Sequence, residues 1–150
     1  MQYISVASGI FVKDEKILLV HHNGFDKWVF PGGHIDDEET PAQTAGREFL
    51  EETNVKVETI SAAPPAFEGD DNDTPIPLPF YMGLAKGGFD SPRVIYYYYV
   101  KAVNDSWELN HQKEELHGVA WFGKDDLKSL DTFEQVRVLS LFAIDNYPKE

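Results

Sequence analysis

The chain contains no cysteine, which excludes disulfide bridges, thiolate nucleophiles and zinc–thiolate sites. It also lacks a run of about 18 uninterrupted apolar residues, the length that a membrane-spanning helix needs. The first dozen residues carry no basic segment and no small-residue cleavage site, so no secretory signal is predicted. A cytoplasmic location is the default expectation, and a length of 150 residues predicts a single domain, residues 1–150.

Basic residues are also scarce. Thirteen lysines and arginines stand against twenty-six aspartates and glutamates, for a formal net charge of −13. Such a surface repels nucleic acid polymers and anionic membranes, so neither is an expected partner. It would also repel a polyphosphate unless bound cations reversed the charge locally, and carboxylates are ligands that hard cations prefer. Excess acid can also serve solubility alone.

Hydrophobic periodicity and turn residues predict strands that alternate with two real helices. The first two strands are expected to pair as a hairpin, and the whole pattern is typical of an α/β or α+β sandwich. Residues 64–79 hold five prolines and four acids, which predicts a long exposed loop. Strands are expected at residues 3–12, 16–22, 55–63, 93–103 and 116–122, a helical turn at 124–130 and an amphipathic helix at 132–146.

The clearest local signals mark a helix over residues 41–53. Thr40 is a good N-cap, Pro41 occupies the first helical position, and Gln43 completes a capping box. Asn54 can adopt the left-handed conformation that often ends a helix. At about 100° per residue, one face of this helix is fit to pack on a sheet. The residues of that face are Ala42, Ala45, Gly46, Phe49 and Thr53.

A second face of the same helix gathers Glu48, Glu51 and Glu52, spaced i, i+3 and i+4. Neighbouring carboxylates repel one another, and the helix dipole disfavours anions in the last turn. A bound Mg²⁺ or Mn²⁺ would turn this cost into a gain. Taken alone, the cluster is explained equally well by a solvated acidic face.

The residues around the cluster favour the metal site. Gly32 and Gly33 let the backbone approach a ligand closely and leave its carbonyl groups accessible. Glu39 follows six residues after Gly33, and Arg47 follows eight residues after Glu39. Arg47 is adjacent to Glu48 and lies i, i+4 from Glu51, so it can orient a carboxylate.

From Gly33 to Val55 the chain resembles the Nudix box, G-x5-E-x7-R-E-U-x-E-E-x-G-U, where U is an aliphatic residue. Phe49 stands at the first aliphatic position and Asn54 replaces the last glycine, and neither change touches the charged positions. A Trp-x-x-Pro-Gly-Gly entry and a Glu-Leu-x-x-Val-x-Trp-Phe segment extend the likeness. The matching residues are Gly33, Glu39, Arg47, Glu48, Glu51, Glu52 and Val55.

This resemblance implies a MutT-like α/β/α sandwich with a mixed central sheet and a Mg²⁺-dependent pyrophosphohydrolase. The implied substrate is a nucleoside diphosphate linked to another group, cleaved by metal-activated water. The implied roles are metal ligation by Glu51 and Glu52, ligation or general base for Glu48, a further ligand from the Gly33 carbonyl, positioning of Glu48 by Arg47, and support from Glu39.

Weaker candidates lie outside the box. Many Nudix enzymes take a further base or metal ligand from a later loop, and Glu114 or Glu115 stands in that place; Glu115 is our catalytic candidate. A role in packing or in the solvated surface is the alternative for every one of these residues. The candidate substrate contacts are Trp28, His34, Phe80 and Tyr81, and His21, His22 and Lys27 flank the same entrance.

The sequence leaves the substrate open. Asp70 and Asp71 stand where ADP-ribose hydrolases of the family carry a proline, and Asn72 stands near the tyrosine position of dinucleoside polyphosphate hydrolases. A nucleoside triphosphate and a nucleotide sugar are both possible substrates, for a monomer or a homodimer. The rival functions are a Nudix module that senses a nucleotide without cleaving it and an acidic scaffold for a basic protein.

Overall fold

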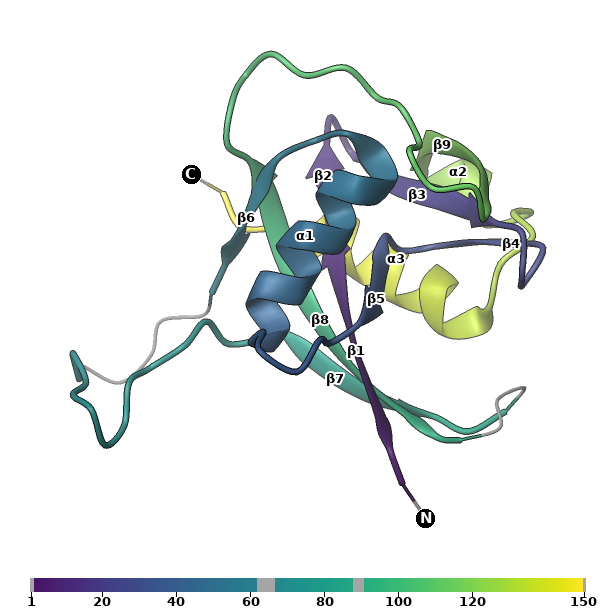
Figure 1. Ribbon diagram of the computed structural model, residues 1–150. Coiled ribbons are helices and arrows are strands. Elements are labelled where there is room, and N and C mark those ends of the chain that lie inside the picture. The colour runs from purple at the N-terminus through teal and green to yellow at the C-terminus, as the bar shows by residue number, and fades with distance from the viewer. Residues whose placement is uncertain (1, 62–66, 88–90, 150) are drawn as a thin grey trace.

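The computed structural model describes residues 2–61, 67–87 and 91–149, and it confirms the expected α/β/α sandwich (Figure 1). Helix α1 (Pro41–Thr53) covers one face of the strands, and helix α3 (Glu134–Asn146) covers the opposite face. A short helix, α2 (Lys124–Leu127), precedes α3. Within the described part of the chain, no helix is long and apolar enough to cross a membrane.

Two sheets form the middle layer of the described structure. The larger sheet is mixed, because β1 runs parallel to β8 while its other pairs are antiparallel. Its strands are β1 (Ile4–Ile10), β5 (Gly32–His34), β6 (Val57–Ile60), β7 (Tyr81–Ala85) and β8 (Arg93–Ala102). The smaller, antiparallel sheet contains β2 (Val12–Lys13), β3 (Lys16–His22), β4 (Lys27–Val29) and β9 (Leu116–Gly123).

The predicted hairpin between residues 3–12 and 16–22 is confirmed only next to its turn, where Val12 pairs with Ile17, and it is wrong for residues 4–10. Strand β1 pairs with β5 and β8, and only the two residues of β2 pair with β3. The chain changes sheets at Phe11, whose buried ring makes edge contacts with Phe49, Trp107 and Trp121. Because residues on both sides of the change are buried, the apolar pattern continues through it without a break.

Several other bounds differ from the expected ones. Strands β4, β5 and β7 were not predicted, and β6 is shorter than residues 55–63, of which 62 and 63 lie outside the described residues. Residues 67–79 contain neither helix nor strand, as expected for a loop; residues 64–66 are not described. Helix α2 ends at Leu127 rather than at residue 130, and α3 begins at Glu134 rather than at residue 132.

The ends of α1 follow the sequence signals closely. The Thr40 hydroxyl accepts a hydrogen bond from the Gln43 N–H, and the Gln43 side chain accepts one from the Thr40 N–H. Asn54 ends the helix with φ 67°, and its N–H donates to the Leu50 carbonyl at 2.9 Å. Both ends are therefore fixed by contacts within four residues, which places the glutamate face at a defined height on the sheet.

Alternate residues of β8 fill two separate cores. Tyr98 and Val100 pack with Phe49 under α1, while Tyr97 and Tyr99 pack toward α3. Each such buried side chain contributes about 1.5–3 kcal/mol of apolar burial. The predicted packing face of α1 is confirmed at Phe49, which is fully buried.

Candidate active site

The glutamate face of α1 is more buried than a helix wheel suggests. Glu48 and Glu52 expose only 6% and 3% of their surface, whereas the Glu51 side chain is 41% exposed. Two carboxylates therefore lie inside the protein, where a charged group is costly unless it is paired or hydrogen-bonded. The solvated acidic face is thus excluded for Glu48 and Glu52.

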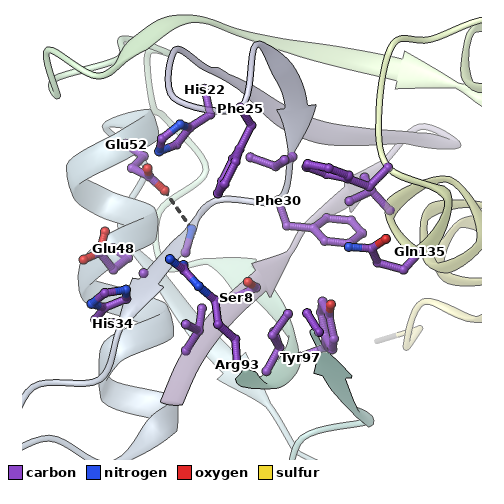
Figure 2. Close-up of a pocket in the computed structure, with 18 of the residues that line it drawn as sticks. Ser8, His22, Phe25, Phe30, His34, Glu48, Glu52, Arg93, Tyr97 and Gln135 are labelled. Atoms are coloured by element: carbon purple, nitrogen blue, oxygen red, sulfur yellow. Dashed lines mark hydrogen bonds between the residues drawn. The ribbon is translucent and has the colours of Figure 1, made fainter. Parts of the chain in front are cut away.

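The two glycines of β5 lie directly against these carboxylates. The Gly32 N–H donates to Glu52 Oε1 at 2.7 Å, a contact drawn as a dashed line in Figure 2. A Cβ atom added to Gly33 would collide with the Glu48 carboxyl group. The absence of side chains at this point is what lets the backbone of β5 and the glutamates of α1 approach each other.

Arg47 connects four acidic side chains at the edge of the cluster. Its Nε and Nη2 atoms donate to both oxygens of Glu39, at 2.8 and 2.9 Å. Its Nη1 atom donates to Glu48 at 3.0 Å and to Glu51 at 3.3 Å. Asp36 completes the group with an ion pair at 3.3 Å. Arg47 thus fixes the orientation of the carboxylates around it, as its place in the sequence predicted.

These environments shift the pKa values of two glutamates in opposite directions. The hydrogen bond from Arg47 lowers the pKa of Glu39 to about 2. Burial raises the pKa of Glu52 to about 8, although the Gly32 N–H favours its ionised form. Without a compensating cation, Glu52 is therefore largely protonated at neutral pH in the folded protein.

Lys113 supplies a cation that sequence reasoning missed. Its ammonium group contacts Glu48 Oε2 directly, lies 3.1 Å from Glu51 Oε2 and lies 4.0 Å from Glu115 Oε1. Lys113 precedes β9 and is separated from Glu48 by 65 positions in the sequence. The position of Lys113 just before the candidate Glu115 could have suggested that it lies near the site. No local sequence pattern, however, relates Lys113 to α1.

A cavity of about 480 Å³ opens beside the cluster (Figure 2). Glu48, Glu52 and Lys113 line one side of it, and Arg93 reaches into it from the first position of β8. Burial lowers the pKa of Arg93, but a guanidinium remains charged at any physiological pH. Other lining residues include Ser8, His22, Phe25, Phe30, Gly32, Gly33, His34, Tyr97, Glu115, Phe133 and Gln135.

The structure brings some of the predicted site residues to this cavity and leaves others elsewhere. Gly33, His34 and Glu115 line it together with the two buried glutamates, and Arg47 and Glu51 lie just behind them. His22, which was expected to flank the entrance, also lines the cavity, whereas Trp28, Phe80 and Tyr81 are not among the described residues that line it. Trp28 packs edge-on against Phe122 and His21, Phe80 stacks on Tyr99 at 3.9 Å between ring centroids, and Tyr81 is 49% exposed. Substrate binding by these three residues stays a prediction.

The donor set suits a hard divalent cation. Carboxylate oxygens converge from one helix face, and they already hold the ammonium group of Lys113, so the cluster attracts positive charge. Within residues 2–61, 67–87 and 91–149, no three acidic or histidine side chains stand close enough together to hold a metal ion as they are. The oxygens of Glu48 and Glu51 instead face Arg47 and Lys113.

Comparison with known proteins gives a consistent result. A family model described as the NUDIX domain matches residues 4–142. The chain therefore belongs to the Nudix family, as the box from Gly33 to Val55 indicated. Membership places it among hydrolases that act on acid anhydrides in phosphorus-containing compounds, with small nucleotide-like molecules as substrates. No match was found among the curated proteins.

Solved structures share the fold. A NUDIX family hydrolase from Clostridium perfringens superposes with a TM-score of 0.79 and 23% identity, covering 97% of this chain and 98% of its own. A MutT NUDIX hydrolase from Burkholderia pseudomallei gives 0.68 and 19%, with coverages of 99% and 100%. The NUDIX domain of Shewanella oneidensis NrtR, in complex with ADP ribose, gives 0.68 and 18%, with coverages of 97% and 88%.

Proposed function

We propose that this protein is a divalent-metal-dependent pyrophosphohydrolase that cleaves a diphosphate bond in a nucleoside diphosphate linked to another group. The observation that carries the proposal is the placement of two buried glutamates, Glu48 and Glu52, at the wall of a cavity that also receives Arg93. A bound anion would meet cations held by these carboxylates, and Arg93 would add a guanidinium to the same cavity.

Glu48, Glu51 and Glu52 would hold Mg²⁺ or Mn²⁺, with the Gly33 carbonyl as a further ligand. When bound there, such a cation neutralises phosphate oxygens and lowers the pKa of an attacking water. Glu52 needs this compensation, because burial raises its pKa and so disfavours the ionised form that a metal ligand must adopt.

Residues of the chain itself supply the rest of the site. Arg47 holds Glu48 and Glu51 in fixed orientations through Nη1. Glu115 lies at the cavity wall within 4.0 Å of Lys113 and is a candidate general base. Arg93 is placed to bind a phosphate in this cavity, and the rings of Phe25, Tyr97 and Phe133 offer apolar faces to a base or sugar.

The test is incubation of the protein with Mg²⁺ or Mn²⁺ and a panel of nucleoside triphosphates, nucleotide sugars, ADP-ribose and dinucleoside polyphosphates. We expect metal-dependent release of phosphate-containing products from at least one of them. Glu52→Gln is the paired variant, and we expect it to remove turnover while the fold stays intact. Failure of every substrate at every metal concentration would exclude the enzymatic function.

The panel also separates hydrolysis from sensing. The NrtR domain that shares this fold was crystallised with ADP ribose, which makes ADP-ribose a useful binding probe. Tight binding of a panel member without cleavage, in the presence of metal, would favour a nucleotide sensor. A complete glutamate set favours the enzyme, since binding alone does not require all three carboxylates.

A further inference from the structure

Lys113 lies among three carboxylates of the candidate active site. Its ammonium group touches Glu48, lies 3.1 Å from Glu51, and approaches Glu115 at 4.0 Å. The Lys113 side chain is only 23% exposed, and Glu48 is buried, so water weakens these ion pairs less than those of the surface. One lysine thus pairs with Glu48 and Glu51, two of the three carboxylates that the proposed function assigns to the metal.

The loop that carries Lys113 is fastened to the end of α1. The Asn54 side-chain amide donates to the Glu108 carbonyl at 3.0 Å and accepts from the Gln112 side chain at 2.6 Å. The Asn110 N–H donates to the Thr53 carbonyl at 3.0 Å. In Figure 1 this loop is the green segment that passes from β8 over the end of α1 to β9.

Asn54 stands where the Nudix box has glycine. A glycine could adopt the same left-handed conformation at φ 67°, but it could make neither of the side-chain hydrogen bonds. This departure from the box pattern therefore serves the loop rather than the helix end, and it holds Lys113 one residue beyond Gln112.

We propose that Lys113 is a resident cation of the glutamate cluster, which a divalent metal ion must displace in order to bind. The inference rests on the proposed function, because it takes the same glutamates as metal ligands. An ammonium group and a divalent cation cannot share the oxygens of Glu48 and Glu51 without strong repulsion. Lys113 therefore stabilises the metal-free protein and weakens its metal affinity at the same time.

The experiment measures binding of Mn²⁺ alone, by electron paramagnetic resonance of the free ion and by calorimetry, at constant ionic strength. We expect Lys113→Met to bind Mn²⁺ about tenfold more tightly than the wild type, a change of about 1.4 kcal/mol. Lys113→Arg keeps the positive charge and should stay near the wild type. Lys128→Met, at an exposed lysine paired with Asp125 on α2, is the matched control and should leave affinity unchanged.

Thermal unfolding gives a second readout that does not depend on turnover. In EDTA, Lys113→Met should unfold at a lower temperature than the wild type, because Glu48 loses a buried partner. Saturating Mn²⁺ should then raise its Tm by more than it raises that of the wild type. Asn54→Gly keeps Lys113 but removes the two side-chain hydrogen bonds that fasten the loop to α1, so it should shift affinity in the same direction by a smaller factor, even if Lys113→Met folds poorly.

The outcomes distinguish this inference from the proposed function. Equal or weaker Mn²⁺ binding by both Lys113→Met and Asn54→Gly would overturn the inference and leave the metal site standing. Mn²⁺ binding by none of the proteins would overturn both. Tighter binding by the variants, with no member of the nucleotide panel cleaved, would support the resident cation and overturn the catalytic proposal.

Discussion

Arg47 holds Glu39 by two parallel hydrogen bonds, from Nε to Oε2 at 2.8 Å and from Nη2 to Oε1 at 2.9 Å. This pair fixes the plane of the guanidinium group, which leaves Nη1 directed at Glu48 and Glu51. The Thr44 hydroxyl also donates a hydrogen bond to Glu39, at 2.8 Å. Glu39, which positions Arg47, is therefore itself held in place by Thr44. Glu39 therefore acts on the cluster through Arg47 and does not touch Glu48 or Glu51 in any contact that we find among the described residues.

Replacing Arg47 by lysine should lower turnover more than it lowers stability. Lysine keeps the charge but cannot form the two-point contact with Glu39 while donating to Glu48. We expect turnover of the best panel substrate, or Mn²⁺ affinity, to fall by about 10–100-fold. Arg137→Lys is the control, since Arg137 donates to the Leu127 and Leu130 carbonyls away from the site. A loss of activity equal to that of the control would contradict a positioning role for Arg47.

Alanine at the two glycines of β5 should have different effects. At Gly33 the added Cβ meets the carboxyl group of Glu48, a side chain that can rotate away from Arg47 and Lys113, so we expect lower turnover, by about tenfold or more, with a smaller loss of stability than at Gly32. At Gly32 it would lie 2.5 Å from the Ala7 carbonyl oxygen, which cannot yield, and stability should fall by about 1–3 kcal/mol. Urea unfolding and turnover assays measure the two effects separately.

Gly87→Ala is the control for both glycine variants, because a Cβ at Gly87 meets none of the described residues within 4 Å. It should match the wild type in both assays. If Gly33→Ala retained full turnover, close approach of the backbone to Glu48 would not matter for function.

Glu52 should make the metal-free protein less stable as the pH rises. In the unfolded chain its proton leaves near pH 4.5, whereas the folded protein keeps it until about pH 8. The folded state therefore binds more protons between these values, and stability falls with increasing pH across this window. Relative to Glu52→Gln in EDTA, the wild type should lose stability from pH 5 to pH 8 and then level off. A constant difference in urea unfolding across this range would refute the shifted pKa.

Glu39 should have the opposite pH dependence. Arg47 lowers its pKa from 4.5 to about 2, so the ionised form is favoured in the folded protein. Its stabilising contribution is complete above about pH 4.5 and is lost as the pH falls toward 2. The stability advantage of the wild type over Glu39→Gln should therefore shrink in acid, which circular dichroism of urea unfolding between pH 2.5 and 6 would detect. An advantage that persists unchanged at pH 2.5 would argue against the ion pair in solution.

The sequence predicted the parts of the site that depend on near neighbours. Thr40, Gln43 and Asn54 define the ends of α1 through contacts within four residues, and Arg47 meets Glu48 and Glu51 on the same helix. Such contacts follow from helical geometry alone. The orientation of the glutamate face could therefore be derived before any tertiary contact was known.

Contacts between distant segments could not be derived in this way. The burial of Glu48 and Glu52 depends on how β5 lies against α1, and Lys113 reaches Glu48 across 65 positions. The sheet change at Phe11 was hidden because buried strands of two sheets carry the same apolar pattern. Strand β7 was hidden because its sequence, Tyr-Met-Gly-Leu-Ala, has no charged or strongly polar residue to alternate with the apolar ones, although Tyr81, Met82 and Leu84 are about half exposed.

Asn54 also joins the end of α1 to the loop that carries Lys113, so that the two segments should unfold locally together. Fraying of the last turn of α1 would break the hydrogen bonds of the Asn54 side chain with Glu108 and Gln112. Detachment of the loop that carries Lys113 would in turn expose the end of the helix. The backbone amide of Asn54 donates within the helix, to Leu50, and that of Asn110 donates from the loop to Thr53. The hydrogens of these two amides should therefore exchange with solvent at a common rate. Any ligand that orders the loop would then also slow amide exchange in the last turn of α1, because Asn54 joins the two segments.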